Sequence, residues 1–474
     1  MSLGKRLYSA LSASALLLGA MSAAHADVAI SADPTSNMSC SGGVCTPTAS
    51  DAVLNVSDLE SYLASGSLEV TTTGSGVQAN NIDVTAPFSW SATNTLTLDA
   101  YDSITVTGAV TDSGAGGVAL DTNDGGSGGA LSFVSGGALT ITNLKDALTI
   151  NGTKYKLEKD IKGLAYDIVK HAPDRAFAMA NDYDAKKDGI YRSSPVPLMF
   201  EGAFNGLGHV IANLEIADSA DSQFGFFYEV QAPGTISSVG LENVAVRATN
   251  ANAVGGLVGA LFGGTVSNSW TSGTINGGYG GDVGGLAGYI VGGVVSNSWS
   301  SAHVVNLNEG EVGGLIGYMN GGTVSGSFAT GRVSKYLCVG GLVGFSDGAI
   351  ANSYAIGPSI GTLNDNDIAG GFVGCSTSLS ISDSYSTGRV KGVTGAVVGG
   401  FVGSSSSSSY SNCYWDKQTS KTKTGVGNGK VKGVKGLTTA QLQSGLPTGF
   451  DPTIWAENPS INNGFPYLIA NPPQ

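Results

Sequence analysis

The chain has 474 residues, of which 72 are glycine, 41% are hydrophobic and only 12% are charged. This apolar content is enough to build a core, so we expect a folded chain of short strands and tight turns rather than a disordered one. The formal net charge of −13 opposes binding to nucleic acids or to anionic membranes.

Residues 1–26 have the pattern of a Sec signal peptide. Lys5 and Arg6 precede the apolar run Leu11–Ala23, and small residues at Ala24 and Ala26 fit cleavage before Asp27. A membrane anchor is the weaker interpretation, because the apolar run is short for a membrane span. No later stretch of the sequence is long and apolar enough to span a membrane. We expect no integral membrane span after cleavage. The protein is expected to be secreted or on the surface of a Gram-negative-type bacterium, with the periplasm as an alternative.

Residues 27–66 are expected to form an N-terminal cap that contains one short helix. Ser57 and Glu60 have the spacing of a capping box, and Gly66 marks the end of the helix.

The five cysteines are expected to include one local disulfide. Cys40 and Cys45 flank a Gly-Gly turn, and an exported chain folds in an oxidising compartment, so these two are predicted to pair. The remaining cysteines occupy different points of the repeat described below, so at least one is expected to be a free, buried thiol; they are Cys338, Cys375 and Cys413.

Residues 67–150 alternate between apolar and polar side chains, as in "NTLTLDAYDSITVTGAV" and "GALTIT", which is typical of half-buried strands. These segments resemble the β-helical rungs of filamentous-haemagglutinin-like adhesins, without the NPNL and NPNG motifs of the two-partner secretion domain. Residues 151–199 are expected to be an insertion that contains a helix, and Pro173 is expected to end that helix. One face of this helix carries Ile161, Leu164, Ala165 and Ile168.

Residues 200–415 contain a repeat of 27 to 30 residues that occurs six times. Each copy opens with a Gly-Gly pair, as in "GGLVG" or "GGFVG", and an aromatic residue follows in "SNSW", "SGSF" or "ANSY". Such a period indicates a solenoid, and the strand-like composition favours a β-solenoid. Copies stacked about 4.8 Å apart would align equivalent residues in columns.

Three columns are predicted. The apolar residues after the Gly-Gly pairs should point into the core; they are Leu257, Leu286, Leu315, Leu342, Phe372 and Phe401. Alternation places Val266, Asn268 and Trp270 on one face. An asparagine ladder then follows from Asn268, Asn297, Asn352 and Asn412, interrupted by Gly326 and Asp383.

The aromatic column consists of Trp270, Trp299, Phe328, Tyr354, Tyr385 and Tyr414. Alternation favours packing of this column in the core, because valines of the same parity must be buried. If the rings pointed outward, they would offer platforms for stacking on sugars. The candidate binding residues are therefore Trp270, Trp299, Tyr354, Tyr385 and Tyr414.

These repeats resemble the GLUG-repeat family of bacterial secreted and surface proteins. "FEGAFNGLGHVIANLEI" (Phe200–Ile216) is similar to the family's lead-in, with Asn205 and Leu207 in place of the usual Asp and Asn, and "NNGFPYL" ending at Leu468 is similar to its close. The resemblance covers roughly residues 175–468. It implies an adhesin or another cell-surface component.

Residues 416–474 are expected to form a basic loop and a C-terminal cap with a short helix in "TTAQLQSG". The loop is interpreted as solvated, with contact to an anionic glycan or cell surface as the alternative. Its six lysines have no acidic residue between them; they are Lys417, Lys421, Lys423, Lys430, Lys432 and Lys435.

The sequence has no H-E-x-x-H or P-loop motif, and we expect no G-x-S-x-G nucleophile elbow among its many glycines. A polysaccharide-active β-helix would need carboxylates or basic residues stacked over neighbouring rungs, whereas the repeats offer serine, threonine, asparagine and aromatic residues. We predict no catalytic residue, metal site or cofactor. Asn364–Asp367 and Asp121–Gly126 could hold calcium, but turn formation explains both more simply.

The sequence thus predicts an all-β fold, a right-handed parallel β-solenoid with short helical insertions and caps. The expected function is non-enzymatic and adhesin-like: a repeated surface that binds a host or neighbouring cell surface, or a glycan, multivalently. The alternatives are a polysaccharide-active β-helix enzyme, either a lyase or a hydrolase, and a structural rod subunit.

Overall fold

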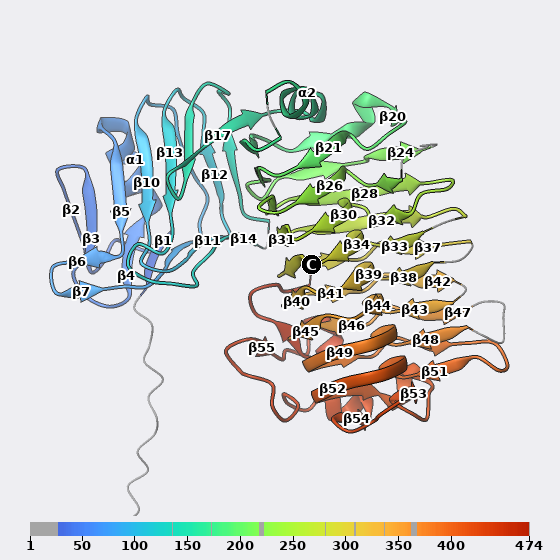
Figure 1. The fold of residues 1–474 in the computed structure, drawn as a ribbon. Coiled ribbons are helices and arrows are strands. Elements are labelled where there is room, and N and C mark those ends of the chain that lie inside the picture. Colours follow the sequence, from blue (N-terminus) through green and yellow to red (C-terminus); the bar gives the residue numbers. More distant parts are fainter. Residues whose placement is uncertain are drawn as a thin grey trace, which may run out of the picture.

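The computed structural model describes residues 27–473 apart from residues 135, 172, 218–221, 280, 308–309, 336 and 362–366. The predicted signal peptide lies outside the described residues. Figure 1 shows two stacks of coils that meet near helix α2 (Ile161–His171). The coils are built from parallel strands and make about 12 turns. The predicted parallel β-solenoid is confirmed.

The first stack (residues 28–150) has three-sided coils. One side is formed by β4 (Ala52–Asn55), β1 (Val28–Ser31), β8 (Ile82–Val84), β11 (Ile104–Val106) and β14 (Leu131–Phe133). The second is formed by β3 (Val44–Pro47), β5 (Leu68–Thr71), β10 (Thr95–Asp99), β13 (Gly117–Asp121) and β16 (Ala147–Ile150). The third is formed by β9 (Phe88–Trp90), β12 (Ala109–Asp112) and β15 (Ala138–Ile141). Alternate apolar side chains of these strands fill one core.

Helix α1 (Val56–Ser65) covers this core near the N-terminal end of the stack through Leu59 and Leu63, both fully buried. Its end at Gly66 is as predicted, but the predicted capping box is wrong. Asn55 is the N-cap and its side chain accepts a hydrogen bond from the backbone of Ser57, whereas Glu60 accepts one from the backbone of Ser89. Because the side chain of Asn55 already accepts from the free backbone N–H of Ser57, the carboxylate of Glu60 is available to accept from Ser89 of the next coil.

The two stacks are joined by residues 151–175. Strand β17 (Thr153–Glu158) pairs antiparallel with β16 and parallel with β18 (Ala176–Met179), so the chain reverses direction here. Helix α2 then packs its buried residues Ile161, Leu164 and Ile168 against the core of the second stack. The predicted insertion is shorter than expected, because β18, β19 (Tyr183–Asp184) and β20 (Ile190–Tyr191) already pair in register with the next coil.

The second stack (residues 176–437) has coils of up to five strands. One coil comprises β33 (Asp282–Gly284), β34 (Ala287–Val291), β35 (Val294–Ser296), β36 (Trp299–Ser300) and β37 (His303–Val305). Each pairs in parallel with its equivalent in the next coil, namely β38 (Glu311–Gly313), β39 (Ile316–Asn320), β40 (Thr323–Ser325), β41 (Phe328–Ala329) and β42 (Val333–Lys335). The predicted column of Leu257, Leu286, Leu315, Leu342, Phe372 and Phe401 is fully buried in the core.

The Gly-Gly corners are required by close backbone approach. A Cβ atom at Gly284 would lie 1.9 Å from the carbonyl oxygen of Ala287, and one at Gly285 would lie 2.2 Å from the carbonyl oxygen of Gly314. Neither position can hold a side chain without moving the backbone, which explains why the pair recurs in every copy.

A ladder of buried serines runs along the inside of the second stack. Each Oγ accepts a hydrogen bond from the backbone amide of the preceding ladder residue, at 3.1 to 3.3 Å, through Ser298, Ser327, Ser353 and Ser384. Cys413 continues this column as a free, buried thiol, which confirms that one cysteine is unpaired. Burial raises the pKa of Cys413 to about 12, so the thiol is an unreactive packing group.

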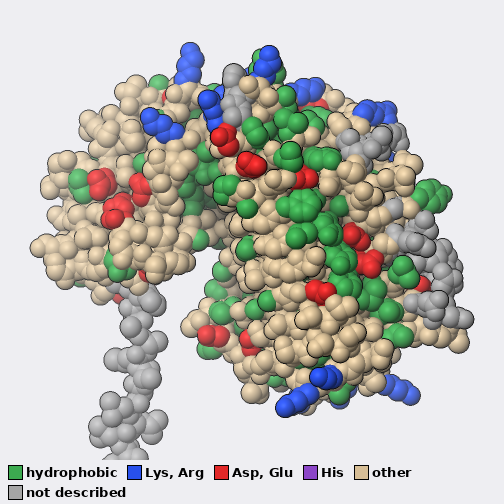
Figure 2. Space-filling view, in the orientation of Figure 1, with side chains coloured by type: hydrophobic (Ala, Val, Ile, Leu, Met, Phe, Trp, Pro, Cys, Tyr) green, Lys and Arg blue, Asp and Glu red, His purple; other side chains and the backbone are tan. Residues whose placement is uncertain are grey.

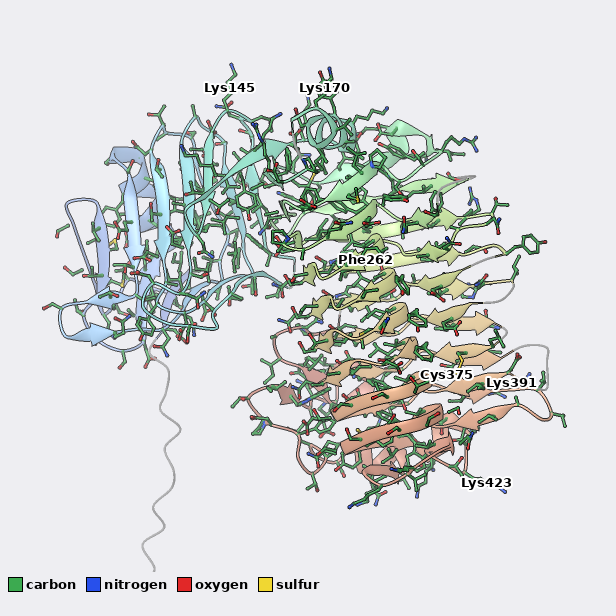
Figure 3. The ribbon with its side chains drawn as sticks, in the orientation of Figure 1. Lys145, Lys170, Phe262, Cys375, Lys391 and Lys423 are labelled. Atoms are coloured by element: carbon green, nitrogen blue, oxygen red, sulfur yellow. A yellow bond between two sulfur atoms is a disulfide. The ribbon has the colours of Figure 1, made fainter. Side chains whose placement is uncertain are left out.

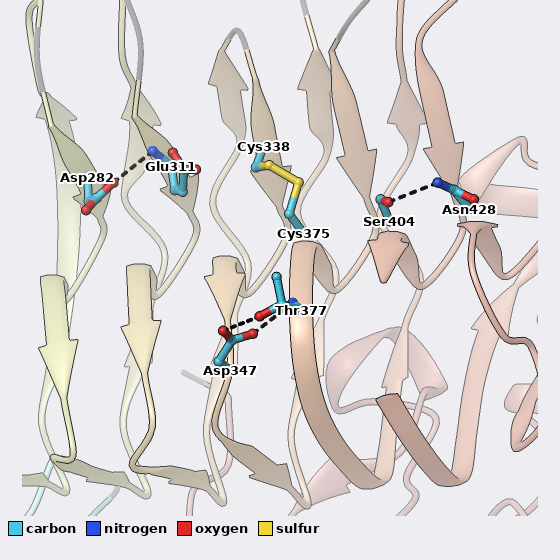
Figure 4. The surroundings of a disulfide bond; sticks show 8 residues. All are labelled: Asp282, Glu311, Cys338, Asp347, Cys375, Thr377, Ser404 and Asn428. Carbon is cyan, nitrogen blue, oxygen red and sulfur yellow. Dashed lines mark hydrogen bonds between the residues drawn. A yellow bond between two sulfur atoms is a disulfide. The ribbon is translucent and has the colours of Figure 1, made fainter. Parts of the chain in front are cut away.

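The other four cysteines form two disulfides, Cys40–Cys45 as predicted and Cys338–Cys375, which was not predicted. Figure 4 shows the second bridge, which joins β43 (Cys338–Gly340) to β49 (Val373–Ser386) of the following coil. The two cysteines lie in different columns, but the bridge spans the corner between adjacent coils with Cα atoms 5.6 Å apart.

The last coils contain the long strands β49 and β52 (Val402–Asp416), followed by α3 (Lys417–Ser420), β53 (Val426–Asn428) and β54 (Val434–Leu437). The predicted basic loop therefore contributes strands to the end of the stack, and its six lysines are exposed. Lys423 projects from this end in Figure 3. The C-terminal segment (residues 438–471) follows, with α4 (Thr439–Leu442), β55 (Trp455–Ala456) and β56 (Tyr467–Leu468). Helix α4 is the predicted short helix of the cap.

Candidate functional site

The predicted aromatic column lies outside the main core of the second stack. Asn268 has a left-handed backbone conformation with φ of 48°, and Asn297 and Asn352 are similar at 45° and 47°. This conformation turns the chain, so Val266 enters the main core whereas Trp270 points to the other side of the strand. The prediction that Val266, Asn268 and Trp270 share a face is wrong, because strict alternation requires an extended backbone at all three residues.

The aromatic rings stack face to face from coil to coil. Ring centroids are 4.8 Å apart for Trp270 and Trp299, 5.7 Å for Trp299 and Phe328, and 4.6 Å for Phe328 and Tyr354, with interplanar angles of 2° to 6°. Tyr354 and Tyr385 continue the stack at 5.2 Å. Most of the ring faces are thus covered by neighbouring rings, and a ligand could reach only their edges.

The C-terminal segment covers most of this column and completes a second core. Its apolar contribution consists of Leu442, Phe450, Trp455, Phe465 and Leu468, with Leu437 from the end of β54. Hydrogen bonds fix the segment in place. The hydroxyl of Tyr385 donates to the carbonyl oxygen of Pro466 at 2.6 Å, and that of Tyr414 donates to the carbonyl oxygen of Thr448 at 2.7 Å.

The exposure of the column changes from one end to the other. Tyr354 and Tyr385 have no exposed surface and Tyr414 is 6% exposed, so these candidate binding residues are packing residues in this structure. Trp299 is 9% exposed, whereas Trp270 is only half-buried. The favoured interpretation, that the aromatic column is packed rather than exposed as a binding face, therefore holds for most of the column. The rings pack against the C-terminal segment, however, and not in the interior of the coil.

A cavity remains over the end of the column near Trp270 and Trp299. It lies where both stacks and the C-terminal segment meet. Its wall includes Phe133, Val134, Gly136 and Gly137 of the first stack, together with Ala470–Pro472. Figure 1 shows the C-terminus between the two stacks, beside β40. The cavity offers about 80 Å³ to the centres of water molecules.

A second aromatic ladder, on the outward face of the second stack, was missed by the sequence analysis. We call Phe262, Tyr289, Tyr318 and Phe345 the outer ladder; all four are partly exposed. Tyr289 stacks on Tyr318 at 5.3 Å, and Tyr318 on Phe345 at 4.6 Å. Phe262 meets Tyr289 edge-on at 6.0 Å. The sequence signal was an aromatic residue at the fifth position after the first glycine in three successive copies.

Three carboxylates influence the phenol group of Tyr318 in the outer ladder. The pKa of Tyr318 is raised by partial burial and then by Tyr289, Asp347, Asp282 and Glu311. Figure 4 shows Asp282, Glu311 and Asp347 around the Cys338–Cys375 disulfide. Figure 2 shows hydrophobic side chains along the visible face of the second stack, with acidic side chains beside them. The outer ladder is thus an aromatic strip with an acidic border.

A separate group of acidic residues lies on the first stack. Asp99 and Asp121 pair in register on neighbouring coils, and Glu69 and Asp124 lie close by around an open cleft of about 520 Å³. Burial, together with the charges of Asp124, Glu69 and Asp121, raises the pKa of Asp99 to about 6. Among the described residues, no group of three or more His, Cys, Asp or Glu side chains has a metal-binding arrangement. Of the calcium candidate Asn364–Asp367, residues 364–366 lie outside the described part of the chain.

Comparison with known proteins gives limited information. The chain is 35% identical over 151 residues to halomucin of Haloquadratum walsbyi. This match covers 29% of the chain and 2% of halomucin. No protein-family model matches the chain, so the GLUG and haemagglutinin-like resemblances stay predictions. No helix in the described part of the chain is long and apolar enough to cross a membrane. The chain is a β-solenoid repeat protein that is similar over part of its length to a very small part of halomucin.

Proposed function

We propose that this protein is a secreted or surface-exposed, non-enzymatic adhesin-like solenoid of the GLUG-repeat type that binds cell-surface or glycan ligands. The observation that carries the proposal is the outer ladder. Its rings lie on the outward face, and carboxylates lie near the hydroxyl group of Tyr318. Partly exposed aromatic residues contribute less to core stability than buried ones, so a binding role is a reasonable explanation for their recurrence in successive coils.

The geometry of the outer ladder favours hydrogen bonding over ring stacking. Because Tyr289, Tyr318 and Phe345 cover one another's faces, only ring edges and phenol oxygens face the solvent. Phenol and carboxylate oxygens both suit the hydroxyl groups of carbohydrates. One-coil spacing repeats this contact along a rigid stack, so individually weak contacts add to a multivalent one.

A glycan array and a cell-adhesion assay with the full exported chain test this proposal. The double variant Tyr289→Phe with Tyr318→Phe removes two hydroxyls while retaining the stacked rings. We expect it to lose adhesion to cells and multivalent binding to the array without a change in melting temperature. Tyr62→Phe, at an exposed tyrosine of α1, is the matched control. Unchanged binding by the double variant would exclude the outer ladder as the site.

One observation favours a second function, that of a polysaccharide-active enzyme. The carboxyls of Asp99 and Asp121 occupy neighbouring coils beside a cleft, and the raised pKa of Asp99 is suited to a general acid. The test is incubation of the protein with acidic and neutral polysaccharides, followed by measurement of reducing ends and unsaturated products. Turnover that Asp99→Asn abolishes would establish the enzyme and displace the adhesin proposal.

A further inference from the structure

The cavity near Trp270 has the form of a partly closed binding site. The C-terminal segment covers the aromatic column fully at Tyr354 and Tyr385, but over Trp270 the cover ends. The ring face of Trp270 that points away from Trp299 is covered by Gly240 of the preceding coil, where an added Cβ would lie only 2.4 Å from the indole atom Cε2. The indole edges of Trp270 and Trp299 are thus what the aromatic column presents to the cavity.

The walls of the cavity are neutral and can form hydrogen bonds. Polar side chains are contributed by Ser238, Asn268, Asn297 and Asn471, and none of the described residues that line the space has an ionisable side chain. The hydroxyl of Ser238 is buried and has no hydrogen-bond partner in the described structure. An unsatisfied buried hydroxyl costs free energy, which a ligand hydroxyl recovers once rotation of the Ser238 side chain turns its oxygen into the cavity.

The position of these walls is fixed by contacts between parts of the chain that are far apart in sequence. Asn268 Nδ2 donates to the carbonyl oxygen of Leu131 at 3.3 Å, and Asn471 Nδ2 donates to that of Gly326 at 3.0 Å. His209 Nε2 lies 2.9 Å from the carbonyl oxygen of Leu139. The two stacks and the C-terminal segment are therefore held together around a preformed space, which lowers the ordering cost of binding.

The size of the cavity limits the ligand. The 80 Å³ open to water centres is room for roughly five to eight waters, given that each needs about 10–15 Å³ by this measure. A ligand that displaces this many waters is comparable in size to a single sugar ring. A charged sugar would be buried without a counter-charge, which is unfavourable.

We propose that this cavity binds one neutral sugar residue, either a free monosaccharide or the terminal residue of a glycan. The sugar hydroxyls meet Ser238 and the asparagine amides, and the apolar face of the ring meets the indole edges and Phe133. The choice of carbohydrate rests on the proposed function, but the site is separate from the outer ladder.

The test uses the full exported chain and a panel of glucose, galactose, mannose and N-acetylglucosamine, with glucuronic acid as the charged comparison. Binding is followed by saturation-transfer NMR and tryptophan fluorescence. Ser238→Gly removes the hydroxyl while tolerating the left-handed backbone, where φ is 54°. It should weaken binding roughly two- to tenfold, the equivalent of one hydrogen bond. Ala470→Leu fills the exposed rim and should abolish binding, and Ala349→Leu, at an exposed alanine of β45 (Ala349–Ala351), is its control.

The inference is supported if a free neutral sugar binds and if Ser238→Gly and Ala470→Leu weaken that binding as described. It is also supported if only oligosaccharides ending in that sugar bind and the two variants have the same effects. Failure of every neutral sugar and oligosaccharide to bind overturns it, as does binding that neither variant changes. The Tyr289 and Tyr318 double variant distinguishes the two proposals, because it should retain sugar binding in the cavity. Cell adhesion that survives Ala470→Leu but not the double variant would leave the proposed function standing on the outer ladder alone.

Discussion

Removing the side chain of Trp455 tests whether the aromatic column and the C-terminal segment form one core. Trp455 is 1% exposed. Its ring lies 6.1 Å from that of Tyr354, 5.9 Å from that of Tyr385 and 4.6 Å from that of Phe450. Its Nε1 donates to Asn352 Oδ1 at 3.3 Å. Trp455→Ala therefore leaves a cavity against the column and an amide without its partner.

The expected cost is about 3–5 kcal/mol for a buried tryptophan replaced by alanine. Area gives a similar value, since an aromatic side chain buries roughly 150–250 Å² at about 25 cal/mol per Å². This cost falls on docking of the C-terminal segment rather than on the coils, because Trp455 does not belong to the main core. Local opening of the segment should become more frequent by a factor of roughly 10² to 10⁴, at 1.4 kcal/mol per tenfold.

Amide hydrogen exchange measures this effect directly. Protection should fall in residues 438–471 and in the column from Phe328 to Tyr414, while residues 28–150 keep their protection. Ile469→Ala, at a residue that is 46% exposed in the same segment, is the control and should change little. If Trp455→Ala melts and exchanges like the unaltered protein, the C-terminal segment does not stabilise the column and the second core is not real.

Three further predictions concern the coils. Leu315→Asp puts an unpaired charge into the main core and should cost several kcal/mol. Lost protection should be centred on residues 284–343 and extend to the other coils that the C-terminal segment joins; uniform loss throughout the chain, residues 28–150 included, would contradict nearest-neighbour stacking. Replacing Cys338 and Cys375 together with serine should lower stability by about 3–4 kcal/mol in denaturant melts, because the bridge closes a loop of 37 residues. The raised pKa of Asp99 means that the folded state holds this proton more tightly than the unfolded state, so ionisation of Asp99 destabilises the first stack as pH rises from about 4 to 6. Asp99→Asn should remove that loss, and an identical dependence of melting temperature on pH in both proteins would refute it.

The sequence was sufficient to predict the main core of the second stack. Each copy repeats one apolar residue beside a Gly-Gly pair, and a residue at a fixed place in a repeat must meet its equivalents when the copies stack. Leu315 and Phe372 are therefore buried as predicted. The same reasoning finds the outer ladder when it is applied to Tyr289 and Tyr318, which occupy one position of the repeat.

Two features depend on geometry that the repeat does not show. The left-handed conformation of Asn268 changes which face Trp270 occupies, and alternation assumes that no such residue intervenes. The Cys338–Cys375 bridge joins different columns of adjacent coils, so a search for cysteines within one column misses it. Contacts between columns depend on the corner angle of the coil, which the spacing of the copies does not specify.

The C-terminal segment changes how the stack should unfold. In a simple solenoid each coil contacts only its neighbours, so stability is close to a sum of nearest-neighbour terms. Here one segment of residues 438–471 bonds to several coils at once, through Gly326, Asn352, Tyr385 and Tyr414. These coils cannot separate from one another without also releasing the segment, so they should open as one cooperative unit. The coil that carries Trp270 lies beyond this group, where the cover ends and the cavity begins. The segment that stabilises most of the aromatic column thus also determines the one place where its edge is open to a ligand.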